Sequence, residues 1–375
     1  MEGDGAERFE TVIVGGGQAG LAAGYHLAKR GLPFVILDAS ERIGDAWRNR
    51  WDSLRLFTPA KYDGLPGWRF PAPGWSFPTK DEMADYLEAY AAKFDLPVQT
   101  GIRVNGLSRE GDRYVVVSGE RRFEADRIVV ATGAERVPKL PPFAFELDSA
   151  IVLLHSSDYR NPGQLREGDV LVVGLGNSGA EIAFELSKSK RTWLSGKPSG
   201  QIPVRHGSRG SRFVLPIVRF AGSHVLTKGT PIGRKLVPKL ATMAAPLIRV
   251  KTKNLVAAGV ERVPRVVGVL DGLPVLEDDR VLEVANVIWC TGYRQEFSWI
   301  DLPIFGEDGE PVHDRGVVVS EPGMYFMGLI FQYAATSNVL PGLGRDAKYI
   351  ARHIASREAE RRASVRESAE VIASV

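Results

Sequence analysis

The sequence contains one strand–turn–helix pattern twice, and each copy is built around a Gly-x-Gly-x-x-Gly turn. The first copy has an apolar run at 11–14 and its turn at 15–20; the second has an apolar run at 170–173 and its turn at 174–179. Such runs predict strands buried on both faces of a parallel sheet. The three glycines permit a tight bend, approach of a pyrophosphate, and close helix–strand packing. The duplication predicts an α/β fold with two Rossmann-like dinucleotide-binding domains.

The two copies differ where the adenosine of a dinucleotide would lie. In the first copy Asp38 follows the second apolar run, about 20 residues beyond the turn, where a carboxylate accepts from the ribose hydroxyls. In the second copy the matching strand ends with Ser195 and, two residues on, Lys197, which would accept a 2′-phosphate that a carboxylate would repel. Arg205 is another candidate for this contact, and Lys197 as a solvated surface residue is the alternative. We therefore expect an unphosphorylated dinucleotide in the first site and NADP(H) in the second.

A single cysteine, Cys290, limits the route that electrons can take. Two dinucleotide sites in one chain make sense when one cofactor reduces the other, so we expect FAD, the hydride acceptor, in the first site. Reductases of the thioredoxin-reductase and glutathione-reductase type pass electrons on through a cysteine pair, and this chain of 375 residues has one Cys. An internal disulfide and a cysteine-based zinc site are excluded as well. We therefore expect electrons to leave the flavin directly, to dioxygen or to a diffusible acceptor.

The overall charge is close to balanced. The chain has 48 Lys and Arg against 45 Asp and Glu, a net charge of +3, which does not suggest a nucleic-acid partner. Residues 1–4 lack the basic and apolar regions of a signal peptide, and no apolar run of about 18 residues could span a membrane. We expect a cytoplasmic protein without a metal site.

Two segments depart from the strand–helix alternation. The segment 44–79 holds four of the seven tryptophans together with five prolines, which favours a lid over the site or a loop packed on the sheet. Between residues 186 and 260 there are fifteen Lys and Arg and no Asp or Glu. That basic stretch is interpreted as helices that cover the pocket with a solvated face. A surface that steers NADPH and an amphipathic contact with an anionic membrane are the alternatives.

Seven short segments occur in the order of one known family. They are Gly15 to Gly20, Gly-Asp-Ala-Trp at 44–47, Phe-Pro-Thr-Lys at 77–80, His-Ser-Ser-Asp-Tyr at 155–159, Gly174 to Gly179, Ile-Trp-Cys-Thr-Gly-Tyr at 288–293, and Phe-Gln at 331–332 through Gly-Arg-Asp-Ala at 344–347. Together they resemble the flavin-dependent (class B) monooxygenase family, most closely its short bacterial members and the plant YUCCA-type enzymes.

The resemblance implies the cofactor contacts and the chemistry. FAD reduced by NADPH would react with dioxygen to form a C4a-(hydro)peroxyflavin, and one oxygen atom would enter a small nucleophilic (N or S) or carbonyl substrate. Because the flavin carries this chemistry, no side chain is expected to act as general acid or base. The residues implied to contact FAD, or to lie near it, are Gly15, Gly17, Gln18, Ala19, Gly20, Asp38, Trp47, Thr132 and Gly133. Those implied for NADP(H) are Gly174, Gly176, Asn177, Ser178, Gly179, Ser195 and Lys197, with Thr291 and Gly292 close by.

The family signature F-x-G-x-x-x-H-x-x-x-(F/Y/W) is half matched, by His155 and Tyr159. Its Phe and Gly positions hold Ser149 and Ile151. Tyr at its last position favours the N- and S-oxygenating branch over the Baeyer–Villiger branch. The position of His155 between the domains implies structural coupling, and a satisfied core or hinge histidine is the alternative. The family's arginine for the 2′-phosphate aligns with Gly196, so Lys197 would have to replace it.

We expect the NADP domain to be inserted into the FAD domain. The FAD domain would comprise 1–147 and 287–375, and the NADP domain 148–286 with a basic helical insertion at about 203–253. The predicted function is an NADPH- and FAD-dependent monooxygenase acting on a small molecule and dioxygen. One alternative is an NAD(P)H-dependent flavin reductase or diaphorase that passes electrons to a quinone, ferredoxin or another acceptor. A cofactor-binding regulatory protein without turnover is a third hypothesis.

Overall fold

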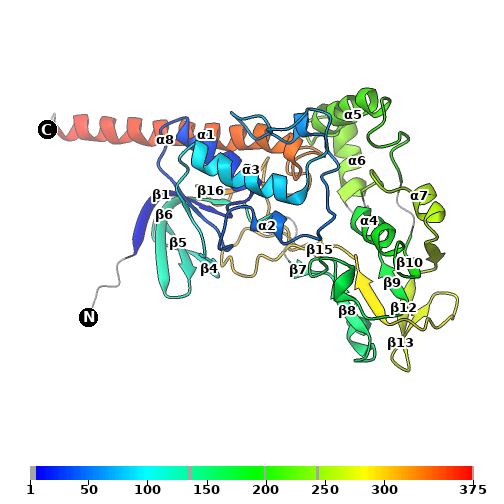
Figure 1. The fold of residues 1–375 in the computed structure, drawn as a ribbon. Helices are drawn as coiled ribbons and strands as arrows, with labels where there is room; N and C mark the ends of the chain where they lie inside the picture. Colours follow the sequence, from blue (N-terminus) through cyan, green and yellow to red (C-terminus); the bar gives the residue numbers. More distant parts are fainter. Residues whose placement is uncertain (1–5, 134–136, 198–199, 242–244, 374–375) are drawn as a thin grey trace.

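Two sheets of mainly parallel strands form the framework of the molecule. They are seen in a computed structural model, which describes residues 6–133, 137–197, 200–241 and 245–373. The two sheets lie side by side with their helices, and the chain passes from the first to the second and back (Figure 1). The predicted α/β fold with two Rossmann-like domains is confirmed. None of the helices in the described ranges is both long enough and apolar enough to span a membrane.

The first sheet has the strand order β3-β2-β1-β6-β5-β4, and β16 pairs with β6. Strands β3, β2, β1, β6 and β16 are parallel, whereas β4, β5 and β6 form an antiparallel meander. The strands are β1 (Glu7–Val14), β2 (Val35–Leu37), β3 (Val98–Gln99), β4 (Gly106–Glu110), β5 (Arg113–Ser118), β6 (Arg121–Val130) and β16 (Met324–Phe326). The apolar run at 11–14 is thus the end of the central strand, buried by neighbours on both sides.

Three helices cover one face of this sheet. They are α1 (Gln18–Ala28), α3 (Lys80–Lys93) and α8 (Leu340–Ala373), and they pack with Ile13, Ile36 and Val129 in one hydrophobic cluster. The alternate residues Val12 and Ile128 belong to a second cluster with the meander strands, because successive side chains of a strand point to opposite faces. Both faces of the central strands are therefore buried, as their apolar sequences require.

The second sheet is fully parallel, with the order β11-β10-β9-β14-β8. Its strands are β8 (Val152–His155), β9 (Val170–Val173), β10 (Thr192–Ser195), β11 (Glu261–Val263) and β14 (Asn286–Trp289). Helices α4 (Asn177–Leu186) and α7 (Thr252–Ala257) contribute to the cluster on one face, and the hairpin β12 (Val266–Leu270) and β13 (Leu273–Leu276) contributes to the cluster on the other.

The two crossings between the sheets lie next to each other. Strand β7 (Val137–Pro138), on the way out, pairs antiparallel with β15 (Tyr293–Arg294), on the way back. Strand β14 pairs with β8 and β9, so it belongs to the second sheet. The chain therefore returns after Trp289, a few residues later than the expected boundary at 287.

The basic insertion reaches from the second unit to the first. It contains α5 (Ser211–Phe220), a π-helical turn (Ala221–Val225) and α6 (Pro231–Ala241). Ser223 Oγ lies 3.1 Å from Thr336 Oγ1, and Arg345 Nη1 donates to the Ser223 carbonyl at 3.0 Å. These contacts tie the insertion to the loop that precedes α8 and to the first turns of α8. The insertion thus contacts both units at their junction.

The Trp- and Pro-rich segment is packed loop with little regular structure. It contains only α2 (Asp45–Arg48) and the 3-10 turn Ala60–Tyr62, and it folds back on itself through the bonds Leu56 N to Pro78 O (2.8 Å) and Ala60 N to Ser76 O (2.9 Å). It ends at the N-terminus of α3.

The start of α3 is fixed by a reciprocal cap that can be tested. Glu82 N donates to Thr79 Oγ1 at 3.1 Å, and Thr79 N donates to Glu82 Oε2 at 2.7 Å. Thr79→Ala removes one partner and should lower the free energy of unfolding by about 1 kcal/mol, measured by urea denaturation. Thr79→Ser keeps the oxygen and should stay near the parent; equal losses in both variants would contradict a capping role.

Candidate functional site

The first glycine turn joins β1 to α1 through contacts that only glycine allows. Gly15 has φ +110°, and its N–H donates to Leu37 O at 2.7 Å. A Cβ on Gly15 would lie 2.5 Å from the Ala131 carbonyl oxygen, and a Cβ on Gly20 would lie 1.9 Å from the Gly15 carbonyl oxygen. In contrast, no atom lies within 4 Å of a Cβ built on Gly17. The first and third glycines of the turn are therefore packed against backbone atoms, whereas the space around the middle glycine is open.

The second turn repeats this geometry between β9 and α4. Gly174 has φ +117°, and its N–H donates to Ser195 O at 2.8 Å. A Cβ on Gly174 would lie 2.2 Å from the Cys290 carbonyl oxygen, and one on Gly179 would lie 1.8 Å from the Gly174 carbonyl oxygen. The middle glycine, Gly176, again has open space around it. The two turns are thus equivalent contact by contact.

Both turns fit the diphosphate of a dinucleotide. Neither α1 nor α4 has a side chain that caps its N-terminal N–H groups, and the N-cap positions are Gly17 and Gly176. Uncapped N–H groups at a helix N-terminus, with the positive end of the helix dipole, form an anion site. Ala19 and Ser178 lie in the first turns of these helices. The residues present therefore suit the phosphates of FAD at the first turn and of NADP(H) at the second.

Asp38 lies beside the first turn, as predicted. Its carboxylate accepts hydrogen bonds from Gly16 N and from Ser40 N, the latter at 2.8 Å. Gln18 and Trp47 also come together, because Trp47 Nε1 donates to Gln18 Oε1 at 3.2 Å. Short helix α2 therefore lies close to the start of α1, and three of the predicted FAD contacts surround one turn.

The matching position of the second site has no side chain. Gly174 N bonds Ser195 O as Gly15 N bonds Leu37 O, so Gly196 corresponds to Asp38. Ser195 is buried, and its hydroxyl donates to Pro264 O at 2.8 Å and accepts from Val266 N at 3.1 Å. The Ser195 hydroxyl thus holds the next loop in place.

Two cations flank Gly196. Lys197 is exposed, and Arg262, on β11, donates from Nη2 to the Gly196 carbonyl at 3.3 Å. Sequence analysis missed Arg262, since it lies far from the glycine turn in the chain. The parallel pairing of β10 and β11 brings it there, with Leu194 opposite Arg262. Asn177 bridges elsewhere, to Pro246 O (3.1 Å) and Ile248 N (2.9 Å), and fixes the end of the insertion.

The strand ends that meet the two turns carry the other predicted residues. Thr132 and Gly133 follow β6, where the backbone of Ala131 lies against Gly15. Thr291 and Gly292 follow β14, where the backbone of Cys290 lies against Gly174. Thr291 Oγ1 donates to Lys139 O, and the Gly292 carbonyl accepts from Lys139 N at 2.9 Å. The repeated Thr-Gly pairs therefore occupy equivalent positions beside the two sites.

His155 couples the second sheet to the crossing. Its Nε2 lies 3.1 Å from the Gly292 carbonyl, and its Nδ1 accepts from Ser157 N at 3.2 Å, so Nε2 carries the proton in this arrangement. The rings of Tyr293 and His155 pack edge to face, with 5.0 Å between their centres. Arg50 Nη1 donates to the Tyr293 hydroxyl at 3.0 Å. His155 thus lies in a contact chain that reaches the Trp-rich segment of the first unit.

Tyr159 is a buried structural contact. Its hydroxyl donates to Glu185 Oε2 at 2.8 Å, and burial, followed by the hydrogen bond to Glu185, raises the pKa of Tyr159 well above its usual value. It packs in the same cluster as α4. His155 and Tyr159 therefore join structural elements, and neither is placed as a proton donor to a ligand by these contacts.

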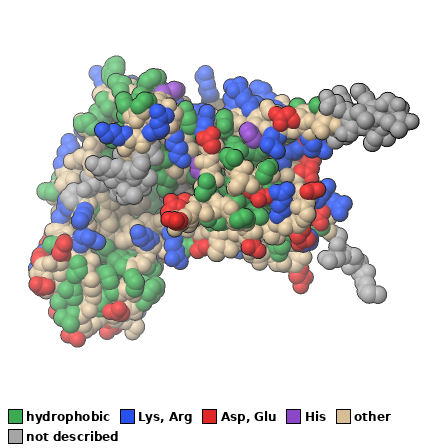
Figure 2. Space-filling model, turned by 180° about the vertical axis from the view of Figure 1, so that it is seen from behind, with side chains coloured by type: hydrophobic (Ala, Val, Ile, Leu, Met, Phe, Trp, Pro, Cys, Tyr) green, Lys and Arg blue, Asp and Glu red, His purple; other side chains and the backbone are tan. Residues whose placement is uncertain are grey.

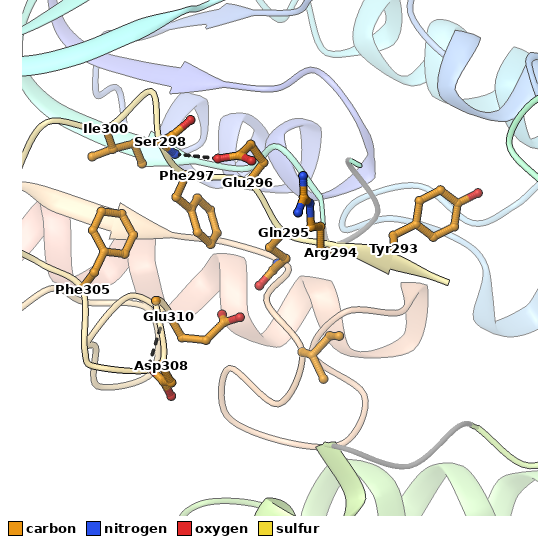
Figure 3. Close-up of a pocket in the computed structure, with 12 residues that line it drawn as sticks. Tyr293, Arg294, Gln295, Glu296, Phe297, Ser298, Ile300, Phe305, Asp308 and Glu310 are labelled. Carbon is orange, nitrogen blue, oxygen red and sulfur yellow. Dashed lines mark hydrogen bonds between the residues drawn. The ribbon is translucent and has the colours of Figure 1, made fainter. Parts of the chain in front are cut away.

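A cavity of about 550 Å³ lies beside the crossing, between the segment after Gly292 and the loop before α8. Phe297, Phe305 and Ile330 supply apolar wall, and Gln295 and Glu310 supply polar groups. In Figure 3 the side chains of Gln295 and Glu310 point toward each other. Gln295 Nε2 is buried without a hydrogen-bond partner, and burial raises the pKa of Glu310. Size and lining suit a small molecule.

Arg205 lines a different cavity. It shares a space of about 350 Å³ with Glu181, Arg249 and other residues of α4 and the insertion. Glu181 is bound to Arg249 at 2.9 Å, yet burial raises the pKa of Glu181 to about 7. Arg205 therefore lines a cavity beside α4, whereas Arg262 contacts the backbone of Gly196, the residue before Lys197.

Two dinucleotide turns on paired α/β units define a two-cofactor oxidoreductase. Residues 12–197 match the family described as pyridine nucleotide-disulphide oxidoreductase. An uncharacterized CzcO-like oxidoreductase of Geobacillus kaustophilus is 38% identical over 91% of this chain and 97% of its own. The probable indole-3-pyruvate monooxygenase YUCCA3 of Arabidopsis thaliana is 30% identical over 92% and 86%, respectively. A flavin-containing monooxygenase from Stenotrophomonas maltophilia, of solved structure, is 28% identical, with a TM-score of 0.75, over 94% and 99%.

The chain belongs to the flavin-dependent monooxygenase family. The predicted family, enzyme class and cofactor pair are thereby confirmed: it is a flavin-containing oxidoreductase of a family that uses FAD and NADP. The assignments of individual residues to these cofactors stay predictions, which the geometry above makes testable.

The open middle glycine of the second turn gives a sharp test. Gly176→Ala places a methyl group in open space, so the fold should tolerate it, whereas the approach of a diphosphate should not. We expect the KM for NADPH to rise at least tenfold with FAD content and melting temperature unchanged. Gly179→Ala is the control, because its Cβ would collide with Gly174 O and should lower stability. An unchanged KM in Gly176→Ala would contradict the assignment.

Asp63, in the Trp-rich segment, should make the free energy of unfolding depend on pH. The side chain is fully buried, Oδ1 accepts from the Thr58 hydroxyl, and Oδ2 has no partner. Burial raises the pKa of Asp63 to about 7, against the lowering effect of the Thr58 hydrogen bond. Between the unfolded pKa, about 4, and the folded one, the folded state binds more protons, so the free energy of unfolding falls as pH rises.

Replacing Asp63 should remove this dependence. In Asp63→Asn the unfolding free energy should fall less steeply across that pH window than in the parent, by about 1.4 kcal/mol per unit of pKa shift removed. Urea denaturation at several pH values within the window measures it. Asp112→Asn, at an exposed position, is the control and should keep the parent slope. Parallel curves for Asp63→Asn and the parent would show that Asp63 is not protonated in the fold.

Proposed function

We propose that the protein is an NADPH- and FAD-dependent monooxygenase that inserts one oxygen atom of dioxygen into a small nucleophilic (N or S) or carbonyl substrate. The observation that carries the proposal is the pair of equivalent glycine turns whose adenosine ends differ. Asp38 lies at the first, and Gly196 with Lys197 and Arg262 lies at the second. Family membership supports the oxygenase chemistry.

The chain's own residues would bind and orient the two cofactors. Gly17 and the N-terminus of α1 would hold the FAD diphosphate, and Asp38 would accept from the ribose. Gly176 and the N-terminus of α4 would hold the NADPH diphosphate. FAD bound there supplies hydride acceptance and reaction with dioxygen, so the protein has to position the reactants and exclude water. The packed Trp-rich segment and the insertion, which cover the junction of the units, are suited to that second task.

The cavity beside Gly292 is our candidate for the substrate. It lies next to the crossing at which His155 and Tyr293 meet. Its wall combines aromatic and aliphatic side chains with charged ones, Arg294, Glu296, Asp308 and Glu310, and with the unpartnered amide of Gln295. An acceptor atom of the substrate would satisfy that amide. The relatives named as indole-3-pyruvate monooxygenases make an aryl α-keto acid one probe of this cavity.

The preference for NADPH is assigned to Lys197 and Arg262. In Lys197→Glu/Arg262→Glu the KM for NADPH should rise at least tenfold while that for NADH changes little, since each charge-assisted contact with a phosphate contributes about 1.5–3 kcal/mol. Steady-state oxidation of the two nucleotides measures this. Lys253→Glu, a charge reversal in the cavity of Arg205, is the control. A parent-like preference in the double variant would refute the assignment, and a shift in Arg205→Glu alone would give the role to Arg205.

Oxygen insertion is tested with a panel of probe substrates. Purified enzyme with NADPH and isotope-labelled dioxygen is given a thioether, a tertiary amine, a cyclic ketone and indole-3-pyruvate, and the products are analysed by mass spectrometry. We expect label in the product of at least one probe, with less hydrogen peroxide per NADPH than in its absence. NADPH consumption matched by peroxide for every probe, together with rapid reduction of quinones, would favour the flavin reductase.

A further inference from the structure

Helix α5 exposes the side chains that a surface helix normally buries. Phe213, Ile217 and Phe220 are 76%, 68% and 60% exposed, and only Ser211 is buried along the whole helix. Their spacing of four and three residues places them on one face. An amphipathic helix of a globular protein usually turns such a stripe toward the core. The apolar face of α5 therefore has no partner among the residues that the structure describes.

Two arginines on one flank of α5 contribute to this orientation. They are directed to aromatic rings of the Trp-rich segment: the Arg212 guanidinium lies 5.8 Å from the centre of the Trp75 ring, and that of Arg219 lies 4.8 Å from the Tyr62 ring. Cation–π contacts of this kind attach the basic side of the helix to the protein. These flank contacts, together with the partly buried Val214, Leu215 and Pro216, hold the helix in this orientation. Phe213, Ile217 and Phe220 then point outward.

Helix α6 extends the apolar surface. Ile232 and Leu236, one turn apart, are 56% and 37% exposed. We call the five side chains Phe213, Ile217, Phe220, Ile232 and Leu236 the α5–α6 face. Figure 1 shows α5 and α6 at the upper right of the molecule. Figure 2 views the molecule from behind, and this end, now at the upper left, carries hydrophobic and basic side chains.

The charge around the α5–α6 face has one sign. No Asp or Glu occurs between residues 187 and 260, whereas fifteen Lys and Arg do. Arg209 is exposed just before α5, and Arg234 and Lys235 are exposed within α6. A second copy of the chain meeting this face about a two-fold axis would bring like charges together. An apolar surface with a basic margin instead matches a bilayer whose headgroups are anionic.

We propose that the α5–α6 face docks the protein on an anionic lipid bilayer, with Phe213, Ile217 and Phe220 inserted at the interface and the neighbouring Lys and Arg on the headgroups. The docking is peripheral and goes beyond the oxygenase function. Because the insertion also contacts Thr336 and Arg345, the docked helices would lie at the membrane side of the junction between the two units. An apolar substrate dissolved in the bilayer would then be close to it.

Flotation with vesicles tests the proposal on the FAD-loaded enzyme. Phosphatidylcholine vesicles with and without phosphatidylglycerol are compared at low and high salt. We expect binding to the anionic vesicles only, weaker at high salt because screening shortens the range of the headgroup field. Phe213→Ser/Ile217→Ser/Phe220→Ser should bind at least tenfold less, and Arg234→Ser/Lys235→Ser should bind less at low salt and show a shallower salt dependence.

Matched controls separate docking from folding and from self-association. Val267→Ser/Leu270→Ser removes side chains that are 51% and 55% exposed on the β12 hairpin and should bind as the parent does. FAD absorbance and NADPH oxidation should be unchanged in all variants, because none of these residues touches the glycine turns. Absence of parent binding at low salt, or parent-like binding by the triple variant, would overturn the proposal. A dimer seen by light scattering that the triple variant abolishes, without vesicle binding, would assign the face to a second copy.

Discussion

The contact between the third glycine and the first glycine of each turn is the constraint on which both cofactor sites depend. A side chain at Gly20 or Gly179 would overlap a carbonyl oxygen of its own turn. Each helix can therefore lie this close to its strand only because the third residue of the motif is glycine. That approach puts the uncapped N-termini of α1 and α4 at the carboxyl edges of the two sheets. Ligands of open α/β sheets bind at this edge.

The relation between the two sites is fixed at the crossing. The Gly292 carbonyl accepts one hydrogen bond from Lys139 N on the outgoing strand, and His155 of the second sheet also lies at hydrogen-bonding distance from it. A single carbonyl oxygen therefore joins the two passages of the chain to the sheet that carries the second turn. These contacts agree with the coupling role that the position of His155 in the family signature implies.

The local features of the fold could be predicted from the sequence, and the non-local ones could not. The glycine turns and the buried runs are defined by neighbouring residues, and they occur as expected. The boundary expected at 287 would place most of β14 in the first unit, but sheet membership depends on the pairing of β14 with β8 and β9. Arg262 reaches Gly196 only through the register of β10 and β11. Which side chains of α5 are exposed depends on its contacts with the Trp-rich segment, which is far away in the chain.

Trp51 has a consequence for the independence of the two units. It comes from the loop after α2, yet it is buried among Tyr159, Leu175 and the core residues of the second sheet. The hydrophobic interior of the nucleotide unit is thus completed by a residue more than a hundred positions upstream. A fragment of the second unit excised at the crossings would lack that indole, and its core would contain a void. The second unit is therefore part of one cooperative structure with the first. Grafting the second unit onto another flavoprotein would require transferring the loop that carries Trp51 as well.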